Sequence, residues 1–333
     1  MPSLFVAHTQ YNLILASGMA SACDELVLFV DFNLSKGLKQ RLQGKFNRCL
    51  FLRGNYPKPP ARWWQKLHKI STDIRALKHF VGYYNRILIV DDMCIQEMYA
   101  LKCAYQQNPM VEMCWLEDGG NAYFSNGVVS GGMGATPLKR SIRKACFSML
   151  YGLRDYYDLG PCMGSHKRLT SAYVTFPDCV RPELQNKKLI PITSEQFNAG
   201  MEVMYAGMQV NFSPGDLLVA MDKLDVYGEN LAKVNDLVAR LVQEAVGKVY
   251  YKYHPRENSA LPALKNCQEL DKTIALESYL TNSPTREMTV IGLKSTALQT
   301  ARKMGYPTIS YIRQVEDNDV VVRFYQKIGI DCR

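Results

Sequence analysis

The pattern of short apolar runs is the feature that most constrains how this chain can fold. In the first half these runs are SLFVAHT, ELVLFVDF, RCLFLRG, RILIVDD and VEMCWLE, and stretches with helical periodicity lie between several of them. A strand with one face in water alternates apolar and polar residues, whereas a strand of a parallel sheet is buried on both faces and shows no such alternation. The first half therefore predicts a parallel sheet that is covered by helices.

The second half repeats this alternation of strand and helix. DLLVAMD reads as a strand, residues 230–248 as an amphipathic helix and KVYYKYH as the next strand, which makes a right-handed βαβ unit. EMTVIGL follows as a strand, and STALQTARKMG follows as a helix that ends on glycine. Residues 155–214 are rich in Pro, Gly, Asn and Thr and have weak periodicity, so we expect the connection between two domains there.

Two α/β halves joined in this way suggest the GT-B arrangement of glycosyltransferases, in which two Rossmann-like domains face a central cleft. We place the two domains at residues 1–205 and 206–333. The final helix is a candidate to pack back on the N-terminal domain.

The sequence shows no sign of a membrane span or of a secretory signal. No apolar run reaches the roughly 18 residues that a spanning helix needs, and the N-terminus lacks the basic region of a signal peptide. The ten cysteines are scattered singly, without a CxxC pair. Such cysteines are typical of a reducing compartment and do not indicate a structural zinc site, so we expect a cytoplasmic protein.

Positive charge is concentrated in one segment of the chain. Residues 36–86 contain thirteen Lys and Arg against a single acid, Asp73, whereas the net charge of the whole chain is +9. Trp63 and Trp64 lie among these basic residues. Basic groups interleaved with aromatic ones suit an anionic surface, such as phospholipid headgroups, an acidic glycan or nucleic acid. A solvated surface segment is the alternative.

A second basic stretch, residues 137–154, has an apolar face at helical spacing. The members of this face are Ile142, Cys146, Met149, Leu150 and Leu153. The face either lies on a membrane surface or packs on the protein core.

Polar side chains follow several predicted strands at the point where each strand ends. Asp222 ends DLLVAMD, and His254 ends KVYYKYH directly before Pro255, which cannot continue a strand. Glu117 and Asp118 stand at the end of VEMCWLED and are followed by two glycines, although EDGG is also an ordinary turn sequence. Because the carboxyl ends of parallel strands lie at one edge of a sheet, we expect Asp222 and His254 at the ends of neighbouring strands.

A phosphate site is predicted at a further strand end. Ser295 and Thr296 follow TVIGLK at the start of a helix, with Lys294 beside them. Hydroxyl groups and the free amides of a helix N-terminus bind phosphate, although the same pair is also an ordinary helix cap.

Three motifs, in this order, resemble those of a known family. LEDGG, YHPRE and LKST are similar to the acidic–acidic–Gly, His-Pro and Ser motifs of bacterial sialyltransferases, above all glycosyltransferase family 52, which includes lipooligosaccharide sialyltransferases. The polysialyltransferases of family 38 share these motifs. The resemblance implies an inverting transfer of sialic acid from CMP-sialic acid to a glycan of lipooligosaccharide or capsule, polysialic-acid-like acceptors included. It implies no cofactor and no metal ion.

The resemblance also implies roles for individual residues. His254 meets the CMP phosphate as general acid or hydrogen-bond donor, and Ser295 and Thr296 hold that phosphate. Glu277, in ALESYL, is the candidate for contact with the ribose or the cytosine. The other donor-binding candidates are Thr9, Pro255 and Lys294. The C-terminal domain then binds the CMP-sugar, and the N-terminal domain lies on the acceptor side.

The base that takes the proton of the acceptor hydroxyl has candidates at two strand ends. By resemblance, family 52 points to Asp222, whereas family 38 points to Glu117 or Asp118. We favour Asp222, because DLLVAMD matches the family 52 pattern in its distance before the His-Pro motif. The residues AM before this Asp depart from the Gly, Ser or Pro that the family often has there. Either carboxylate can act if it is ionised at neutral pH.

The basic segment suits such an enzyme as a membrane contact. We expect Trp63 and Trp64 to hold a peripheral protein on the anionic inner membrane of a bacterium, and we leave a homodimer open. One alternative is a relative that transfers another sugar, as a hexosyltransferase does. The other is a non-catalytic protein that binds a nucleotide or nucleic acid. The sequence disfavours a nucleic-acid partner, since it shows no RNA-binding strand motif, zinc module or helix-turn-helix pattern.

Overall fold

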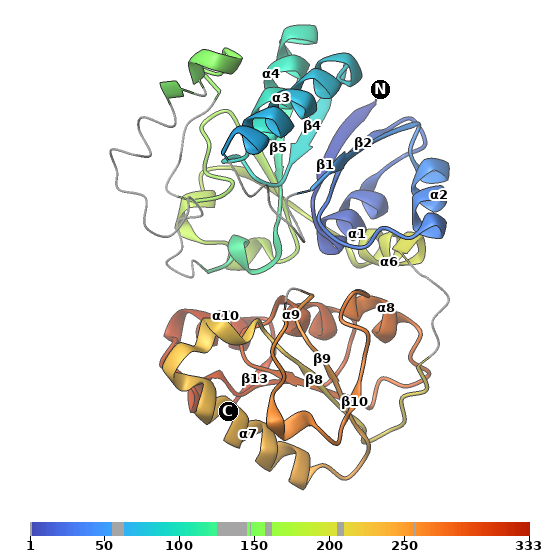
Figure 1. Cartoon of the computed structure of the whole chain (residues 1–333), viewed down its shortest axis with the longest axis vertical. Helices are drawn as coiled ribbons and strands as arrows, with labels where there is room; N and C mark the ends of the chain where they lie inside the picture. Colours follow the sequence, from blue (N-terminus) through green and yellow to red (C-terminus); the bar gives the residue numbers. More distant parts are fainter. Residues whose placement is uncertain are drawn as a thin grey trace. The chain divides into compact units, whose positions relative to one another are not determined.

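The computed structural model describes residues 2–54, 63–124, 145–146, 148–156, 162–204, 210–255 and 257–333. Residue contacts divide the chain into two compact units, Met1–Met204 and Tyr205–Arg333. Figure 1 draws the first unit in blue to yellow-green and the second in yellow to red. Each unit is built around its own sheet. Among the described helices, none is long and apolar enough to cross a membrane.

The first unit contains a seven-stranded sheet in which every pairing is parallel. Its strands are β1 (Ser3–Ala7), β2 (Glu25–Val30), β3 (Arg48–Arg53), β4 (Arg86–Ile89), β5 (Glu112–Leu116), β6 (Ser171–Val174) and β7 (Lys188–Pro191), in the order β3-β2-β1-β4-β5-β6-β7. Its helices are α1 (Gln10–Met19), α2 (Lys36–Lys45), α3 (Trp63–Phe80), α4 (Ile95–Gln107) and α6 (Ser194–Met204). Helices α1, α2 and α6 gather on one face, and α3 and α4 on the other (Figure 1).

The second unit contains a six-stranded sheet, again with every pairing parallel. Its strands are β8 (Leu217–Ala220), β9 (Val249–Lys252), β10 (Gln268–Glu269), β11 (Thr289–Gly292), β12 (Thr308–Ser310) and β13 (Asp331–Cys332), in the order β10-β9-β8-β11-β12-β13. Its helices are α7 (Leu231–Glu244), α8 (Leu276–Thr281), α9 (Thr296–Lys303) and α10 (Asp319–Lys327). The last helix, α10, belongs to this unit, and its Val322 packs in the same apolar cluster as Val238 of α7.

Burial explains why the central strands carry no alternation. All five residues of β1 and the first five of β2 are buried, because helices cover both faces of the sheet. The prediction of two parallel sheets from unalternating apolar runs is therefore confirmed. Residues 155–214, where we expect the connection between the domains, contain the boundary between the two units and also β6, β7 and α6, which the sequence did not predict. Strands of four residues are too short to show a period, and β7 lies at a half-exposed edge.

Both sheets have the same doubly wound strand order. Successive strands are first added on one side of the first strand, and the strands that follow are then added on its other side. The switch lies between β1 and β4 in the first unit and between β8 and β11 in the second. At such a switch point the loops after the two strands diverge, and the carboxyl edge there is where α/β proteins bind ligands.

Two glycines let α1 and α6 touch backbone to backbone. A Cβ atom added to Gly200 would lie 1.9 Å from the carbonyl oxygen of Ile14, and one added to Gly18 would lie 1.8 Å from that of Gln196. Only glycine fits at both positions, and the contact attaches the last helix of the first unit to the helix that follows β1.

We expect Gly200→Ala to lower the free energy of unfolding by about 3 kcal/mol or more, because the two helix backbones must separate to admit the methyl group. The measurement is the midpoint of urea unfolding followed by circular dichroism. Gly44→Ala is the matched control, since no atom lies within 4 Å of a Cβ added at this helical site. That control should gain about 0.5–1 kcal/mol. Equal midpoints for the two variants would contradict the close contact.

Candidate active site

Three predicted site residues leave the second sheet side by side. Ala220 of β8 pairs with Lys252 of β9 and with Gly292 of β11. The residues two positions further along are Asp222, His254 and Lys294. The register therefore brings all three to the same level of the carboxyl edge, with Asp222 in the middle, and the expectation that Asp222 and His254 follow neighbouring strands is confirmed.

The Asp222 carboxylate ties two strand ends together through one of its oxygens. The backbone N–H of Lys294 donates to Oδ2 of Asp222 at 3.1 Å. The hydroxyl of Tyr227, in the 3₁₀ segment η4 (Leu224–Asn230), donates to the same oxygen. Within the described part of the chain, Oδ1 of Asp222 accepts no hydrogen bond. It is therefore the oxygen that can take a proton from a substrate.

Burial raises the pKa of the Asp222 carboxyl above its ordinary value, against the hydrogen bonds from Tyr227 and Lys294, which lower it. A carboxylate with a raised pKa is a stronger base than a solvated one, provided it is still ionised at the working pH. The two donors favour that ionised form.

Lys294, Ser295 and Thr296 form the strand-to-helix junction that the sequence predicted. The ammonium group of Lys294 lies 2.9 Å and 3.0 Å from the carboxylate oxygens of Glu316. Ser295 is the N-cap of α9 and accepts a hydrogen bond from the N–H of Ala297 at 3.4 Å, and Thr296 is the first helical residue. The helix N-terminus can thus offer amides and hydroxyls to an anion, while the charge of Lys294 is shared with Glu316.

His254 and Pro255 lie in a turn that closes directly after β9. The N–H of Glu257 donates to the carbonyl oxygen of His254 at 2.9 Å. This bond bends the chain back at the end of the strand and leaves the His254 side chain partly buried.

Glu277 belongs to the same region of the second unit. It lies buried in the first turn of α8 and interacts electrostatically with Lys252, the last residue of β9. Burial lowers the pKa of Lys252 to about 8, although the charges of Glu277 and Asp271 oppose this shift. Glu277 is therefore close enough to interact electrostatically with Lys252, which ends the strand that precedes His254.

The other acidic pair, Glu117 and Asp118, lies at the end of β5 in the first unit. Glu117 is fully buried, and it accepts hydrogen bonds from the hydroxyls of Tyr11, Tyr123 and Thr175 and from the N–H of Thr175 at 2.8 Å. These four donors make Glu117 an anchor for the surrounding loops. Asp118 is the partly exposed carboxylate of the pair.

Asn12 connects this acidic pair to the end of β1, a role that the sequence analysis missed. Thr9 caps α1 in a capping box, in which the N–H of Asn12 donates to the Thr9 hydroxyl oxygen at 3.2 Å and the N–H of Thr9 donates to Oδ1 of Asn12 at 3.1 Å. The amide nitrogen of the fully buried Asn12 side chain donates to Oδ1 of Asp118 at 3.1 Å. Thr9, predicted to bind the donor, thus lies in the first unit and caps a helix. An Asn inside an apolar helix is the signal that could have identified Asn12.

The switch point of the first sheet is occupied by a charged histidine. Nε2 of His8 lies 2.7 Å from Oε1 of Glu97, and its Nδ1 lies 3.6 Å from Oδ2 of Asp31. Glu97 is fully buried and also accepts from the N–H of Val90 at 2.7 Å. Burial alone would lower the pKa of His8, but the charge of Glu97 and hydrogen bonds to Asp31 and Glu97 raise it to about 10.

The same residues form a group with donor atoms suited to a metal. Among the described residues, one atom each of His8, Cys94 and Glu97 lies within 4.8 Å of the others. The His8 ring is already bound to the carboxylate of Glu97, and burial together with the charge of Glu97 raises the pKa of the Cys94 thiol. Within this group, His8 and Glu97 form an ion pair.

Some basic side chains of residues 36–86 form ion pairs with acidic residues of the same unit. Arg48 bonds both carboxylate oxygens of Glu25, at 2.7 Å and 2.8 Å, and Lys69 pairs with Asp73 at 2.7 Å. Other basic side chains of α2 and α3 are exposed, namely Lys36, Lys39, Lys66, Arg75 and Lys78. Trp63 begins α3, and its side chain lies outside the described residues.

Exposed apolar side chains accompany these charges. Trp64 is 49% exposed, and Met149 and Leu150 are 82% and 61% exposed. The hydroxyls of Tyr151 and Ser71 are 2.9 Å apart, so the short helix at residues 148–151 lies against α3. Leu153 packs in the core, so the apolar face predicted at residues 137–154 is divided between core and surface in its described part.

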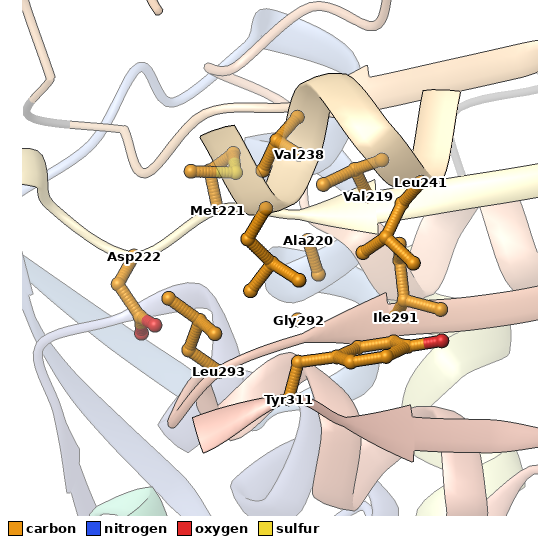
Figure 2. A pocket seen from close by; sticks show the side chains of 11 residues that line it. Val219, Ala220, Met221, Asp222, Val238, Leu241, Ile291, Gly292, Leu293 and Tyr311 are labelled. Carbon is orange, nitrogen blue, oxygen red and sulfur yellow. The ribbon is translucent and has the colours of Figure 1, made fainter. Parts of the chain in front are cut away.

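Asp222 also lies at one end of a pocket between α7 and the second sheet (Figure 2). The other residues that line it are Val219, Ala220, Met221, Leu237, Val238, Leu241, Ile291, Gly292, Leu293 and Tyr311. Most of them belong to the buried apolar cluster of this unit. A pocket without convergent polar groups does not suit a nucleotide, so we assign no substrate to it.

Comparisons with known proteins place this geometry in a family. The family model described as alpha-2,8-polysialyltransferase (POLYST) matches residues 55–313. No curated protein matches the sequence. The resemblance to bacterial sialyltransferases is confirmed, and the non-catalytic alternative is not supported.

Solved structures with the same fold are distant in sequence. An alpha/beta-galactoside alpha-2,3-sialyltransferase from Photobacterium phosphoreum aligns with a TM-score of 0.50 at 10% identity, over 99% of this chain and 98% of that one. A UDP-GlcNAc 2-epimerase from Neisseria meningitidis aligns with a TM-score of 0.53 at 10% identity, over 99% of this chain and 95% of that one. These similarities establish the two-domain GT-B fold that the sequence predicted.

We expect His8→Gln to destabilise the protein by about 3 kcal/mol at low pH, because it leaves buried Glu97 without a charged partner. The folded pKa of His8, about 10, exceeds its ordinary value of 6.5, so protonated His8 stabilises the fold fully below pH 6.5 and loses this effect as the pH rises toward 10. Urea unfolding of both proteins at several pH values measures the difference. The exposed His79, changed to Gln, is the control. A difference that is constant with pH would contradict a protonated His8.

Proposed function

The chain belongs to the alpha-2,8-polysialyltransferase family, and on that premise we propose that it transfers sialic acid from CMP-sialic acid to a glycan acceptor, with inversion and without a metal ion. The observation that carries this proposal is that Asp222, His254 and Lys294 follow three neighbouring strands at equivalent positions of the carboxyl edge of the second sheet. A carboxylate, an imidazole and a helix N-terminus are the groups that such a transfer requires.

The donor is bound through its phosphate in this proposal. The N-terminus of α9, with the hydroxyls of Ser295 and Thr296, holds the phosphate of CMP, and His254 donates a hydrogen bond or a proton to it. As the bond between the sugar and the phosphate oxygen breaks, negative charge grows on CMP. Donors that already point to that position stabilise the charge without further rearrangement. Glu277 is the proposed contact for the ribose or the cytosine.

Asp222 is the proposed base. Its oxygen Oδ1, which accepts no hydrogen bond from the described residues, takes the proton of the acceptor hydroxyl, and that hydroxyl attacks the anomeric carbon on the face opposite to the departing CMP. The two donors on Oδ2 favour the ionised form of the carboxylate and hold it in one orientation. The enclosure of Glu117 by four donors favours Asp118 as the alternative base of the acidic pair.

We expect acceptor-dependent release of CMP from CMP-sialic acid in the presence of EDTA. His254→Ala and Asp222→Asn should each lower kcat by about 10²–10⁴-fold, the usual contribution of general acid or base catalysis, whereas Asp118→Asn should change it only a few-fold. The assay uses a lactose-terminated oligosaccharide and a short sialic acid oligomer as acceptors, so that it also reports the acceptor class.

Each other outcome changes a different part of the proposal. Loss of activity in Asp118→Asn, with activity kept in Asp222→Asn, would move the base to the first unit. Loss of activity with EDTA, restored by a divalent metal, would contradict the metal-free mechanism. No CMP release by folded wild-type protein with either acceptor would remove sialic acid as the sugar, and other nucleotide sugars would then be tested.

We further propose that the exposed apolar and basic side chains near α3 bind the anionic surface of a membrane. Wild-type protein should sediment with phosphatidylglycerol vesicles but not with phosphatidylcholine vesicles, and the double variant Met149→Ser/Leu150→Ser should bind several-fold more weakly. Met110→Ser is the control, because Met110 is 88% exposed but lies in the turn after α4. Equal binding by all three proteins would contradict this contact.

A further inference from the structure

Glu257, in the turn after His254, binds two loops with one carboxylate. Its Oε2 accepts from the N–H of Leu224 at 2.6 Å, and its Oε1 accepts from the N–H groups of Asn258 at 2.8 Å and Ser259 at 2.7 Å. The residue is only 5% exposed. Each oxygen of a buried carboxylate therefore serves a different part of the chain.

The two loops are those that present the proposed acid and base. Leu224 begins η4, the segment that follows Asp222 and contributes Tyr227 to its carboxylate. Asn258 and Ser259 continue the turn in which the N–H of Glu257 itself binds the carbonyl oxygen of His254. The segments after β8 and β9 are thus joined by Glu257, in addition to the pairing of the strands themselves.

We infer that Glu257 is a positioning residue, which fixes the distance and orientation between His254 and Asp222 by holding both loops to one carboxylate. This inference rests on the proposed function, because it assigns Glu257 a role only if those two residues act on the same substrate. Misplacement of a catalytic group by about 1 Å can cost about a hundredfold in rate, so a bond that sets this geometry matters beyond its effect on stability.

A carboxylate is required at this position because all three partners are donors. Burial would raise the pKa of Glu257, but the hydrogen bonds from the N–H groups of Leu224, Ser259 and Asn258 outweigh it, and the pKa is lowered. Glutamine has nearly the same shape, yet one of its two terminal atoms is itself a donor. Glu257→Gln must therefore give up either the bond to Leu224 or the bonds to Asn258 and Ser259.

The chain offers a matched control at the opposite edge of the same two strands. Asp216, 4% exposed, precedes β8, and its carboxylate accepts from the N–H of Lys248 at 2.9 Å and from that of Ser213 at 2.8 Å. Lys248 precedes β9. Asp216→Asn thus breaks the same kind of bond between the same strands, but far along the strands from the carboxyl edge.

The first test is kinetic. Thermal unfolding first establishes a temperature at which wild type, Glu257→Gln and Asp216→Asn are all folded. We expect Glu257→Gln to lower kcat about 10- to 100-fold while the KM for CMP-sialic acid changes less than about threefold, and Asp216→Asn to keep both constants while losing comparable stability. If Glu257→Gln does not fold, Glu257→Asp replaces it, because it keeps the charge but is too short to reach both loops. An unchanged kcat in a folded Glu257 variant would overturn the inference.

The second test needs no substrate. Glu257→Ala removes all three bonds, so amide hydrogen exchange of Leu224 and of Asn258 and Ser259 should become faster together in this variant and stay unchanged in Asp216→Asn. Faster exchange in one loop alone in Glu257→Ala would overturn the coupling. Coupled exchange in a protein that transfers no sialic acid would overturn the proposed function and, with it, the role of Glu257 in catalysis. Transfer at the wild-type rate by Glu257→Gln would instead leave the proposed function in place.

Discussion

The order of strands in each parallel sheet decides where charged side chains can meet in this protein. In a parallel sheet all strands end at the same edge. The loops that follow two neighbouring strands diverge where the order of strand addition switches from one side of the first strand to the other. This switch lies between β1 and β4 in one unit and between β8 and β11 in the other. His8 and Glu97 meet at the first of these points, and Asp222 meets the backbone of Lys294 at the second.

Carboxylates bound by backbone N–H groups hold the loops that leave these edges. A buried carboxylate without partners is costly, so it is found where donors are available, and the donors in turn are held in place by it. Glu97 binds the N–H groups after β4, Asp222 binds that of Lys294 after β11, and Glu257 binds those of two loops. The loops that carry the proposed chemistry are therefore anchored to the sheet by charge-assisted hydrogen bonds as well as by apolar packing.

The two units use the same topology for different purposes. In the first unit the carboxylate of Glu97 accepts hydrogen bonds from the N–H groups of Val90 and Asp91 and pairs with Nε2 of His8. In the second unit Oδ1 of Asp222 accepts no hydrogen bond from the described residues, and this carboxylate lies beside the N-terminus of α9. The fold alone does not distinguish a sialyltransferase from an epimerase, since both share it with this chain. The distinction comes from the match to the polysialyltransferase family model.

The sequence by itself determined the class of fold and the positions of the proposed acid, base and phosphate site. These are local features: a buried parallel strand needs an apolar run without alternation, and the polar residue that ends the run marks the edge of the sheet. Strands such as β10 and β13, with two residues each at the exposed edges, leave no such signal and were missed. Only the tertiary structure decided that Asp222 lies between the other two strand ends, that Glu316 binds Lys294, and that Glu257 joins two loops. Each of these depends on strand register and on burial, which are set by contacts between residues far apart in the chain.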